Sequence, residues 1–173
     1  MVFIAWRPEF SVGIVELDDD HRHLIALLNE SHSALAMDED KGRLALRSIL
    51  ESLIWYTRSH FKAEEVLMQH YAYPKSASHK AEHDRLTKQV TQFANSFKLG
   101  SNAISLEVAT MLEEEWLGKH ILQCDAAYAH FFRSNGMMDM VIKHVNGQKA
   151  ARERHHTPVQ DWLRHGRVAA PHW

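Results

Sequence analysis

The chain has 173 residues, a formal net charge of −2 and one cysteine. The length suits one domain with a sizeable core, and the near-neutral charge gives no reason to expect a nucleic-acid partner. No apolar run approaches the ~20 residues of a membrane span, and a single cysteine cannot form an internal disulfide. We therefore expect a cytoplasmic protein, and the scarcity of Gly and Pro favours long helices.

The first 17 residues are rich in apolar side chains but lack a helical period, and a proline and a glycine interrupt them. This pattern predicts an N-terminal arm over residues 1–17 that lies over the body of the protein. Asp18, Asp19 and Asp20 follow as candidate N-caps. A first helix is predicted from there to about Met37, because apolar residues recur at helical spacing.

A second helix is predicted from about Arg43 to about His70, after the polar break at residues 38–42. It ends there because Pro74 pushes the residue before it out of the helical region. A third helix begins near Ser76 or Ser78 and stops at Gly100, since glycine commonly ends helices.

A fourth helix is predicted to begin after residue 102 or at Ser105 and to stop at residues 134–136. Four long helices joined by short polar loops predict an all-α fold, an up-down-up-down four-helix bundle within residues 1–136. Residues 137–173 carry 6 Lys+Arg against 3 Asp+Glu and five histidines. We predict that they form a basic, histidine-containing C-terminal extension, with a short helix over residues 137–149 followed by a flexible tail.

Side chains typical of metal ligands recur on the inner faces of all four predicted helices. They are His21 on the first helix, His60 and Glu64 on the second, His79 and His83 on the third, and His120 and Asp125 on the fourth. A spacing of four residues places both members of a pair on one helical face. One such pair alone is commonly a surface hydrogen bond, but four helices that each contribute indicate a metal site on the bundle axis.

His120 and Asp125 are five residues apart, which separates them by roughly 140° around a regular α-helix. Two solutions are open. Asp125 reaches sideways across the bundle, or the helix contains a π-bulge, a feature found mostly at functional sites.

The ordered pattern His…His-x-x-x-Glu…His-x-x-x-His…His-x-x-x-x-Asp resembles that of the hemerythrins, and in particular the single-domain bacterial members of the hemerythrin-like family. The resemblance covers about Trp6 to Phe132 and includes Ser11-Val12-Gly13-Ile14 and Trp116-Leu117-Gly118-Lys119-His120. It implies two Fe ions joined by an oxo or hydroxo bridge. The implied ligands are His79, His83 and His120 on one iron, His21 and His60 on the other, and Glu64 and Asp125 as bridges.

That ligand count leaves one coordination position open, on the iron held by His21 and His60. The family binds dioxygen there, so the resemblance implies reversible oxygen binding for storage, transport or delivery, or sensing, and no enzymatic activity. Candidates for the apolar pocket wall are Leu24, Ile25, Trp116 and Ile121, for which ordinary bundle core is the alternative.

Two other classes of function stay open. One is a di-iron enzyme or stress protein that handles peroxide, nitric oxide or iron on the same scaffold. The other is a sensor module in which residues 137–173 contact a protein partner. We expect a monomer.

Several other polar residues are predicted to lie outside the site. His23 is expected at the surface, His32 as a buried and hydrogen-bonded core residue, Glu65 facing solvent, and Cys124 as a small buried side chain. Asp20 departs from the glutamine common at this position in bacterial relatives and is expected to alter the surroundings of the ligands.

Overall fold

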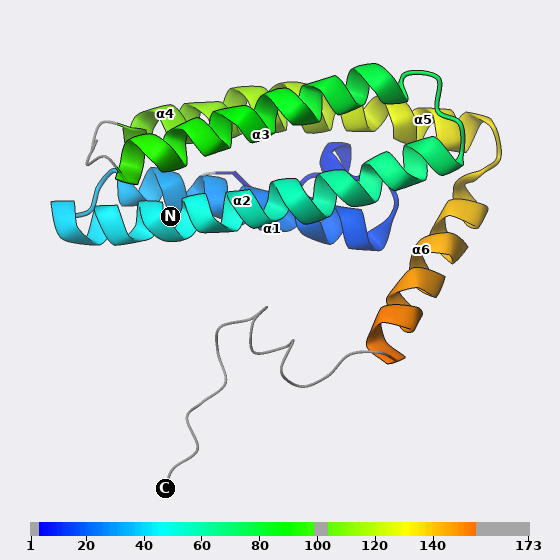
Figure 1. The fold of residues 1–173 in the computed structure, drawn as a ribbon, viewed down its shortest axis with the longest axis horizontal. Coiled ribbons are helices and arrows are strands. Elements are labelled where there is room, and N and C mark those ends of the chain that lie inside the picture. The colour runs from blue at the N-terminus through cyan, green and yellow to red at the C-terminus, as the bar shows by residue number, and fades with distance from the viewer. Residues whose placement is uncertain (1–3, 99–103, 155–173) are drawn as a thin grey trace, which may run out of the picture. The chain divides into compact units, whose positions relative to one another are not determined.

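The computed structural model describes residues 4–98 and 104–154, and every regular element in these ranges is a helix (Figure 1). The chain separates into two compact units, Met1–Gly136 and Met137–Trp173. The first unit contains the bundle, and the second contains helix α6 (Met138–Arg154).

The first unit is a bundle of four long helices, of which consecutive ones run in opposite directions (Figure 1). They are α1 (Val15–Ala34), α2 (Glu39–His70), α3 (Ser76–Lys98) and a composite fourth helix made of α4 (Ile104–Thr110), the π-helical segment η2 (Met111–Asp125) and α5 (Ala126–Ser134). Both α1 and α3 pack against α2 and against the fourth helix. The predicted four-helix bundle is therefore confirmed.

The N-terminal arm is shorter than predicted, because α1 begins at Val15 and not at Asp18. The Asp18 side chain does not cap the helix. Its carboxylate instead accepts hydrogen bonds from the Ser11 hydroxyl (2.6 Å) and the Val12 amide (2.7 Å). Asp18 thus fastens the arm to α1, and a short 3₁₀ turn, η1 (Pro8–Phe10), directs the buried Phe10 side chain inward.

Helix α2 also begins earlier than predicted, at Glu39, so the polar stretch at residues 38–42 is not a loop. Asp38 caps this helix by accepting a hydrogen bond from the Lys41 amide at 3.1 Å. Gly42 lies inside the helix, where a Cβ atom would come within 3.1 Å of the Ala34 carbonyl oxygen. Glycine at this position therefore allows the close approach of α1 and α2.

Helices α2 and α3 end and begin where the sequence predicts, at His70 and Ser76. After α2 the chain turns through Ala72, whose φ of 51° lies in the left-handed region. The Tyr73 amide bonds back to the Met68 carbonyl oxygen at 2.8 Å, which closes the end of the helix. The predicted stop of the third helix at Gly100 lies outside the described residues.

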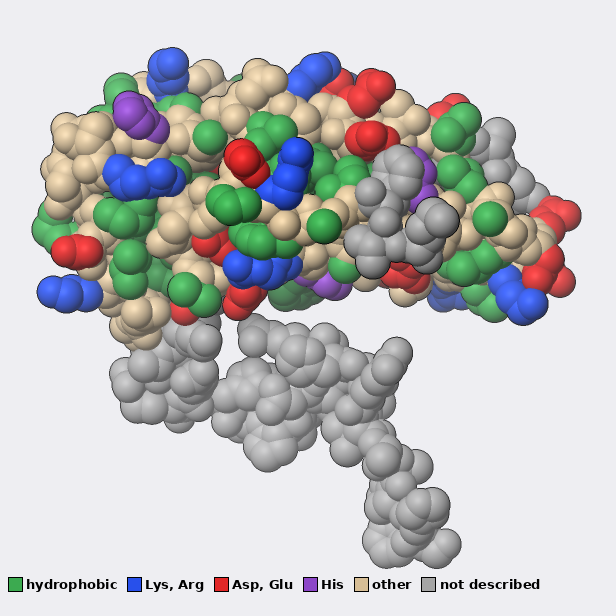
Figure 2. All heavy atoms as spheres, turned by 180° about the vertical axis from the view of Figure 1, so that it is seen from behind, with side chains coloured by type: hydrophobic (Ala, Val, Ile, Leu, Met, Phe, Trp, Pro, Cys, Tyr) green, Lys and Arg blue, Asp and Glu red, His purple; other side chains and the backbone are tan. Residues whose placement is uncertain are grey.

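The apolar core occupies the part of the bundle away from the α2–α3 turn. It is built from Phe10 of the arm and from the facing sides of α1, α2, α3 and the fourth helix; Leu28, Ile49, Leu53, Leu86 and Val108 are typical members, each at most 1% exposed. The remaining bundle interior, nearer the α2–α3 turn, holds buried polar side chains together with apolar ones such as Met68 and Phe132. Few histidines are visible on the face in Figure 2, since five of them lie inside.

In the second unit, α6 extends to Arg154, five residues beyond the predicted limit of residue 149. Arg152 and Glu153 continue the helix because both residue types favour helical backbone. The histidines at 155, 156, 165 and 172 lie outside the described residues. Among the described residues, no helix is long and apolar enough to cross a membrane.

The strained residue at the end of α2 gives a stability prediction. Replacing Ala72 with glycine removes the clash of a Cβ atom at positive φ, so we expect A72G to raise the free energy of unfolding by about 0.5–1 kcal/mol. Urea denaturation of the metal-free protein measures this change. Ala26→Gly, at an exposed position inside α1, is the matched control and should lower stability by a similar amount; a loss of stability in both variants would contradict the strain at Ala72.

Candidate metal centre

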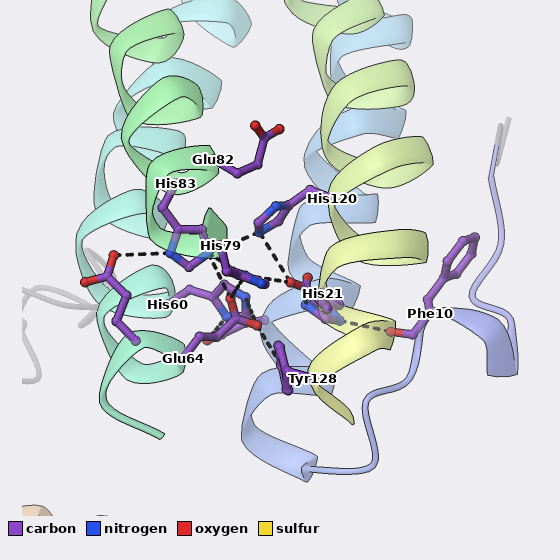
Figure 3. A network of polar contacts seen from close by, with 12 residues as sticks. Phe10, His21, His60, Glu64, His79, Glu82, His83, His120 and Tyr128 are labelled. Atoms are coloured by element: carbon purple, nitrogen blue, oxygen red, sulfur yellow. Dashed lines mark hydrogen bonds and ion pairs between the residues drawn. The ribbon is translucent and has the colours of Figure 1, made fainter. Parts of the chain in front are cut away.

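All seven predicted ligands lie together in the bundle interior near the α2–α3 turn; Figure 3 shows the five histidines and Glu64. His21 comes from α1, His60 and Glu64 from α2, His79 and His83 from α3, and His120 and Asp125 from η2. His79 is the most exposed of them, at 5%, and four of the seven are fully buried. Burying so many polar groups costs free energy unless each group finds a partner.

The π-helical segment η2 explains the five-residue spacing between His120 and Asp125. Its backbone hydrogen bonds run from i to i+5, so residues five apart come to lie on one face. His120 Nε2 is accordingly 3.4 Å from Asp125 Oδ1. Of the two solutions that the sequence left open, the π-helical one is correct, although it extends over 15 residues rather than a single bulge.

Two residues of η2 accommodate the wider helix. A Cβ atom on Gly118 would lie 3.3 Å from the Glu113 carbonyl oxygen, five residues earlier, so a larger residue would crowd the backbone. The Gln123 side chain donates a hydrogen bond to the Gly118 carbonyl oxygen at 3.2 Å. Local sequence therefore supports the geometry that brings Asp125 to His120.

Each buried carboxylate points its two oxygens towards different histidines. Glu64 Oε1 lies 3.4 Å from His60 Nε2, whereas Oε2 lies 3.1 Å from His83 Nε2 and 3.6 Å from His79 Nε2. Asp125 repeats this division. Its Oδ2 is 3.3 Å from His21 Nε2, and its Oδ1 is 3.3 Å from His79 Nε2.

The ligand atoms consequently form two groups, each with all atoms within 4.8 Å of one another. One group is Glu64, His79, His83 and His120, and the other is His21, His60, Glu64 and Asp125. Glu64 belongs to both. Two neighbouring cations could therefore share its carboxylate, and Asp125, which faces His79 and His120 as well as His21, could join them a second time.

Three of the histidines are oriented by hydrogen bonds on their outer ring nitrogens. His21 Nδ1 donates to the Phe10 carbonyl oxygen at 2.9 Å, His60 Nδ1 lies 3.0 Å from Asp20, and His83 Nδ1 lies 3.2 Å from Glu65. All three acceptors hold the proton on Nδ1. The Nε2 atoms then face the interior, which is the arrangement of metal-binding histidines.

The inner nitrogens are poorly satisfied without a cation. His83 Nε2 lies 3.1 Å from His79 Nε2 and 3.2 Å from His120 Nε2, so three ring nitrogens converge on one small space. Within the described ranges, His21 Nε2, His60 Nε2 and both Asp125 oxygens have no hydrogen-bond partner. These residues fit a metal ion, and a set of imidazoles and carboxylates suits iron and neighbouring divalent metals.

Proton affinities in the cluster reflect the competition between burial and charge. Burial lowers the pKa of His60, but the Glu64 and Asp20 carboxylates outweigh it and raise the pKa to about 10. Burial likewise opposes the effect of Asp125 and Glu64 on His79, whose pKa rises to about 9. Burial dominates at His120, where it lowers the pKa to about 4.

The pKa values of the two buried carboxylates are lowered. Burial raises the pKa of Glu64, but the His60 charge and the neighbouring His79 and His83 rings bring it well below its usual value. The pKa of Asp125 is also lowered, because His120, His21 and His79 outweigh burial and the Glu64 charge. Both carboxylates are therefore ionised near neutral pH, as metal binding requires.

Three residues outside the seven ligands differ from expectation, namely Glu65, His32 and Cys124, each of which is half-buried. Glu65 does not face solvent. It is half-buried, and its carboxylate accepts a hydrogen bond from His83, which lies on the neighbouring helix α3. His32 is half-buried rather than buried, with Nε2 at 3.5 Å from the Glu113 carboxylate. His23 is exposed as predicted, and Cys124 is half-buried, where burial and the Asp125 charge raise its pKa.

Some contributors to the site are missing from the sequence-based prediction. The Tyr128 hydroxyl donates a hydrogen bond to Glu64, the Tyr56 ring stacks on His60 with centroids 4.5 Å apart, and the Phe10 carbonyl oxygen orients His21. Tyr128 had a detectable signal, because it stands three residues after Asp125 on the same inner face. The role of the Phe10 carbonyl group could not be predicted, because a backbone carbonyl in an irregular segment leaves no pattern in the sequence.

Comparison with known proteins is consistent with this arrangement. Residues 12–131 match the model of the hemerythrin HHE cation binding domain. The bacteriohemerythrin of Stenotrophomonas maltophilia (strain R551-3) is 35% identical over 146 residues, which cover 84% of this chain and 86% of that protein. The bacteriohemerythrin of Methylococcus capsulatus (strain ATCC 33009 / NCIMB 11132 / Bath) is 31% identical over 129 residues, covering 74% and 95%.

A solved structure agrees with the fold. The crystal structure of a wild-type hemerythrin superposes with a TM-score of 0.65 at 30% sequence identity, covering 73% of this chain and 95% of that one. The matched region contains all seven ligand candidates. From the bundle, the buried cluster and these matches, we conclude that the chain belongs to the hemerythrin family.

Proposed function

We propose that this protein binds dioxygen reversibly at a non-haem di-iron site and serves in oxygen storage, delivery or sensing. The observation that carries the proposal is the division of seven buried donors into two unequal groups that share a carboxylate. Three histidines stand on one side, His79, His83 and His120. Two stand on the other, His21 and His60.

The unequal division decides where a small ligand would enter. If Glu64 and Asp125 each give one oxygen to each iron, the three-histidine side has five protein donors and the two-histidine side has four. A bridging oxo or hydroxo group would raise these numbers to six and five. The two-histidine side then keeps one position for an incoming ligand.

The chemistry of the donors favours binding over oxidation of substrates. Five imidazoles, which are neutral when they bind a metal, support ferrous iron, whereas carboxylate-rich di-iron sites favour more oxidised states. When bound, the two irons would supply electrons to dioxygen reversibly. The chain's own part is to hold the ligands rigidly, keep a proton on each outward Nδ1 and exclude water.

Apolar side chains surround the cluster on the core side. Leu24, Ile25, Trp116 and Ile121 are each at most 5% exposed and belong to the same hydrophobic cluster as Tyr56 and Phe61. The Tyr56 ring stacks on His60, and the Phe61 ring stacks on His83 with centroids 3.9 Å apart. We propose that these residues form a dry wall that slows the escape of reduced oxygen species and so keeps binding reversible.

We propose that residues 137–173, which are basic by composition, contact a protein partner and take no part in oxygen binding. A reducing compartment such as the cytoplasm suits a chain with one cysteine.

The function is tested by loading the protein anaerobically with ferrous iron and then admitting oxygen. We expect two irons per chain and a visible absorption band that appears with oxygen and disappears when oxygen is removed. Irreversible conversion to an oxidised form without such a band would contradict the proposal. Turnover of hydrogen peroxide or nitric oxide faster than by free iron would instead favour the enzyme alternative.

Removing one ligand should lower metal content. His120→Ala takes one imidazole from the three-histidine group, so we expect it to bind clearly less than two irons per chain, as measured by elemental analysis. His130→Ala is the matched control, because His130 is an exposed residue on the same composite helix. Two irons and an unchanged spectrum in His120→Ala would rule out its role as a ligand.

Metal binding should strengthen as pH rises. His60 and His79, with pKa values of about 10 and 9 in the metal-free cluster, hold protons at neutral pH that a cation must displace. The affinity for Co(II) should therefore increase by about tenfold per pH unit for each proton displaced. Titrations between about pH 6 and pH 8 measure this dependence, and a constant affinity would contradict it.

The same pKa values set the stability of the metal-free protein. Both lie above the ordinary value of 6.5, so the contribution of these ion pairs is complete below that pH and is lost as pH rises through 9 to 10. Urea denaturation across this range should show the decline, and a rise in stability with pH would be the opposite of the expected result.

A further inference from the structure

The Tyr128 hydroxyl group is in direct contact with the candidate metal centre. It donates a hydrogen bond of 2.6 Å to Glu64 Oε1. Tyr128 is 1% exposed and Glu64 is fully buried, so bulk water does not compete for this oxygen. The contact joins α5 to α2 across the bundle, as Figure 3 shows.

The hydrogen bond falls on one particular side of the cluster. Glu64 Oε1 is the oxygen that faces His60, at 3.4 Å, whereas Oε2 faces His83 at 3.1 Å. Asp125, the other carboxylate shared between the histidine groups, receives no hydrogen bond on either oxygen from the described residues. Glu64 Oε2 lies 3.1 Å from the His83 ring nitrogen, so among the four carboxylate oxygens of the cluster Oε1 is the one that accepts a hydrogen bond from a hydroxyl group.

A hydrogen bond to a ligand oxygen withdraws electron density from it and makes it a weaker donor to a cation. The effect here falls on the two-histidine side, which already has fewer nitrogen donors. A metal ion with fewer and weaker donors is a stronger Lewis acid, and its lower oxidation state is favoured because the higher state depends more on donation.

We propose that Tyr128 is a positioning residue that fixes Glu64 and weakens its Oε1 as a donor, so that the iron beside His21 and His60 stays reduced and ready for a ligand. The inference rests on the proposed di-iron function and deepens it. It assigns the control of that iron to one hydroxyl group outside the set of ligands.

Packing holds the Tyr128 ring in place. Its centroid lies 5.6 Å from that of Phe132, 5.7 Å from that of His79 and 6.5 Å from that of Tyr73. A ring fixed on several sides keeps its hydroxyl group directed at Glu64. Replacing Tyr128 with phenylalanine removes one oxygen atom and leaves the ring contacts in place.

The test compares the iron-loaded Tyr128→Phe variant with the unmodified protein by redox titration. We expect a ratio of oxidised to reduced iron about tenfold higher at a given potential, which for a one-electron couple is a midpoint lower by about 59 mV. The infrared carboxylate bands of Zn(II)-loaded protein should shift as well. Tyr73→Phe is the matched control, because it removes the hydroxyl group of a buried tyrosine that packs against Tyr128, and it should leave both signals unchanged.

A second variant keeps the proposal testable if Tyr128→Phe does not fold. Substituting 2,3-difluorotyrosine at position 128 keeps the shape and strengthens the donor, so the midpoint should move in the opposite direction. An unchanged midpoint in both variants, together with unchanged carboxylate bands, would overturn the proposal. Neither measurement uses oxygen, so a failure of reversible oxygen binding would be seen separately in the oxygen titration.

Discussion

The structure depends on two buried carboxylates that each serve two sets of histidines. Glu64 from α2 and Asp125 from η2 enter the same space from opposite helices, and each directs one oxygen to the two-histidine group and one to the three-histidine group. Four helices must meet at this point, because no helix supplies more than two ligands. The bundle, the arm that orients His21 and the turn after α2 all maintain this meeting point.

Metal binding also explains an otherwise costly helix. A π-helix has poorer backbone geometry than an α-helix and persists where function requires it. Here it is what brings His120 and Asp125 to one face, and Gly118 and Gln123 support it locally. Regular α-helical geometry would turn Asp125 away and leave Glu64 as the only shared carboxylate.

Hydrophobic period and proline placement were sufficient to predict the four helices and the α2–α3 turn, because both act within a few residues of the chain. The predicted start of α1 at Asp18 was wrong. The Asp18 side chain does not cap the helix but bonds to the arm, and this contact depends on tertiary structure. Glu65 was misplaced for the same reason, since its partner His83 comes from another helix. The spacing of histidines and carboxylates was sufficient to predict the seven side chains that the structure brings together. The groups that orient these side chains could be identified only in the three-dimensional structure.

The proposed function requires two irons that share these carboxylates within one chain. X-ray absorption at the iron edge tests it most directly, with the protein loaded anaerobically and with His120→Ala beside it. We predict two irons per chain, nitrogen-rich first coordination spheres and an iron–iron scattering path that weakens in the variant. A single iron per chain, or two irons without an iron–iron path, would contradict it.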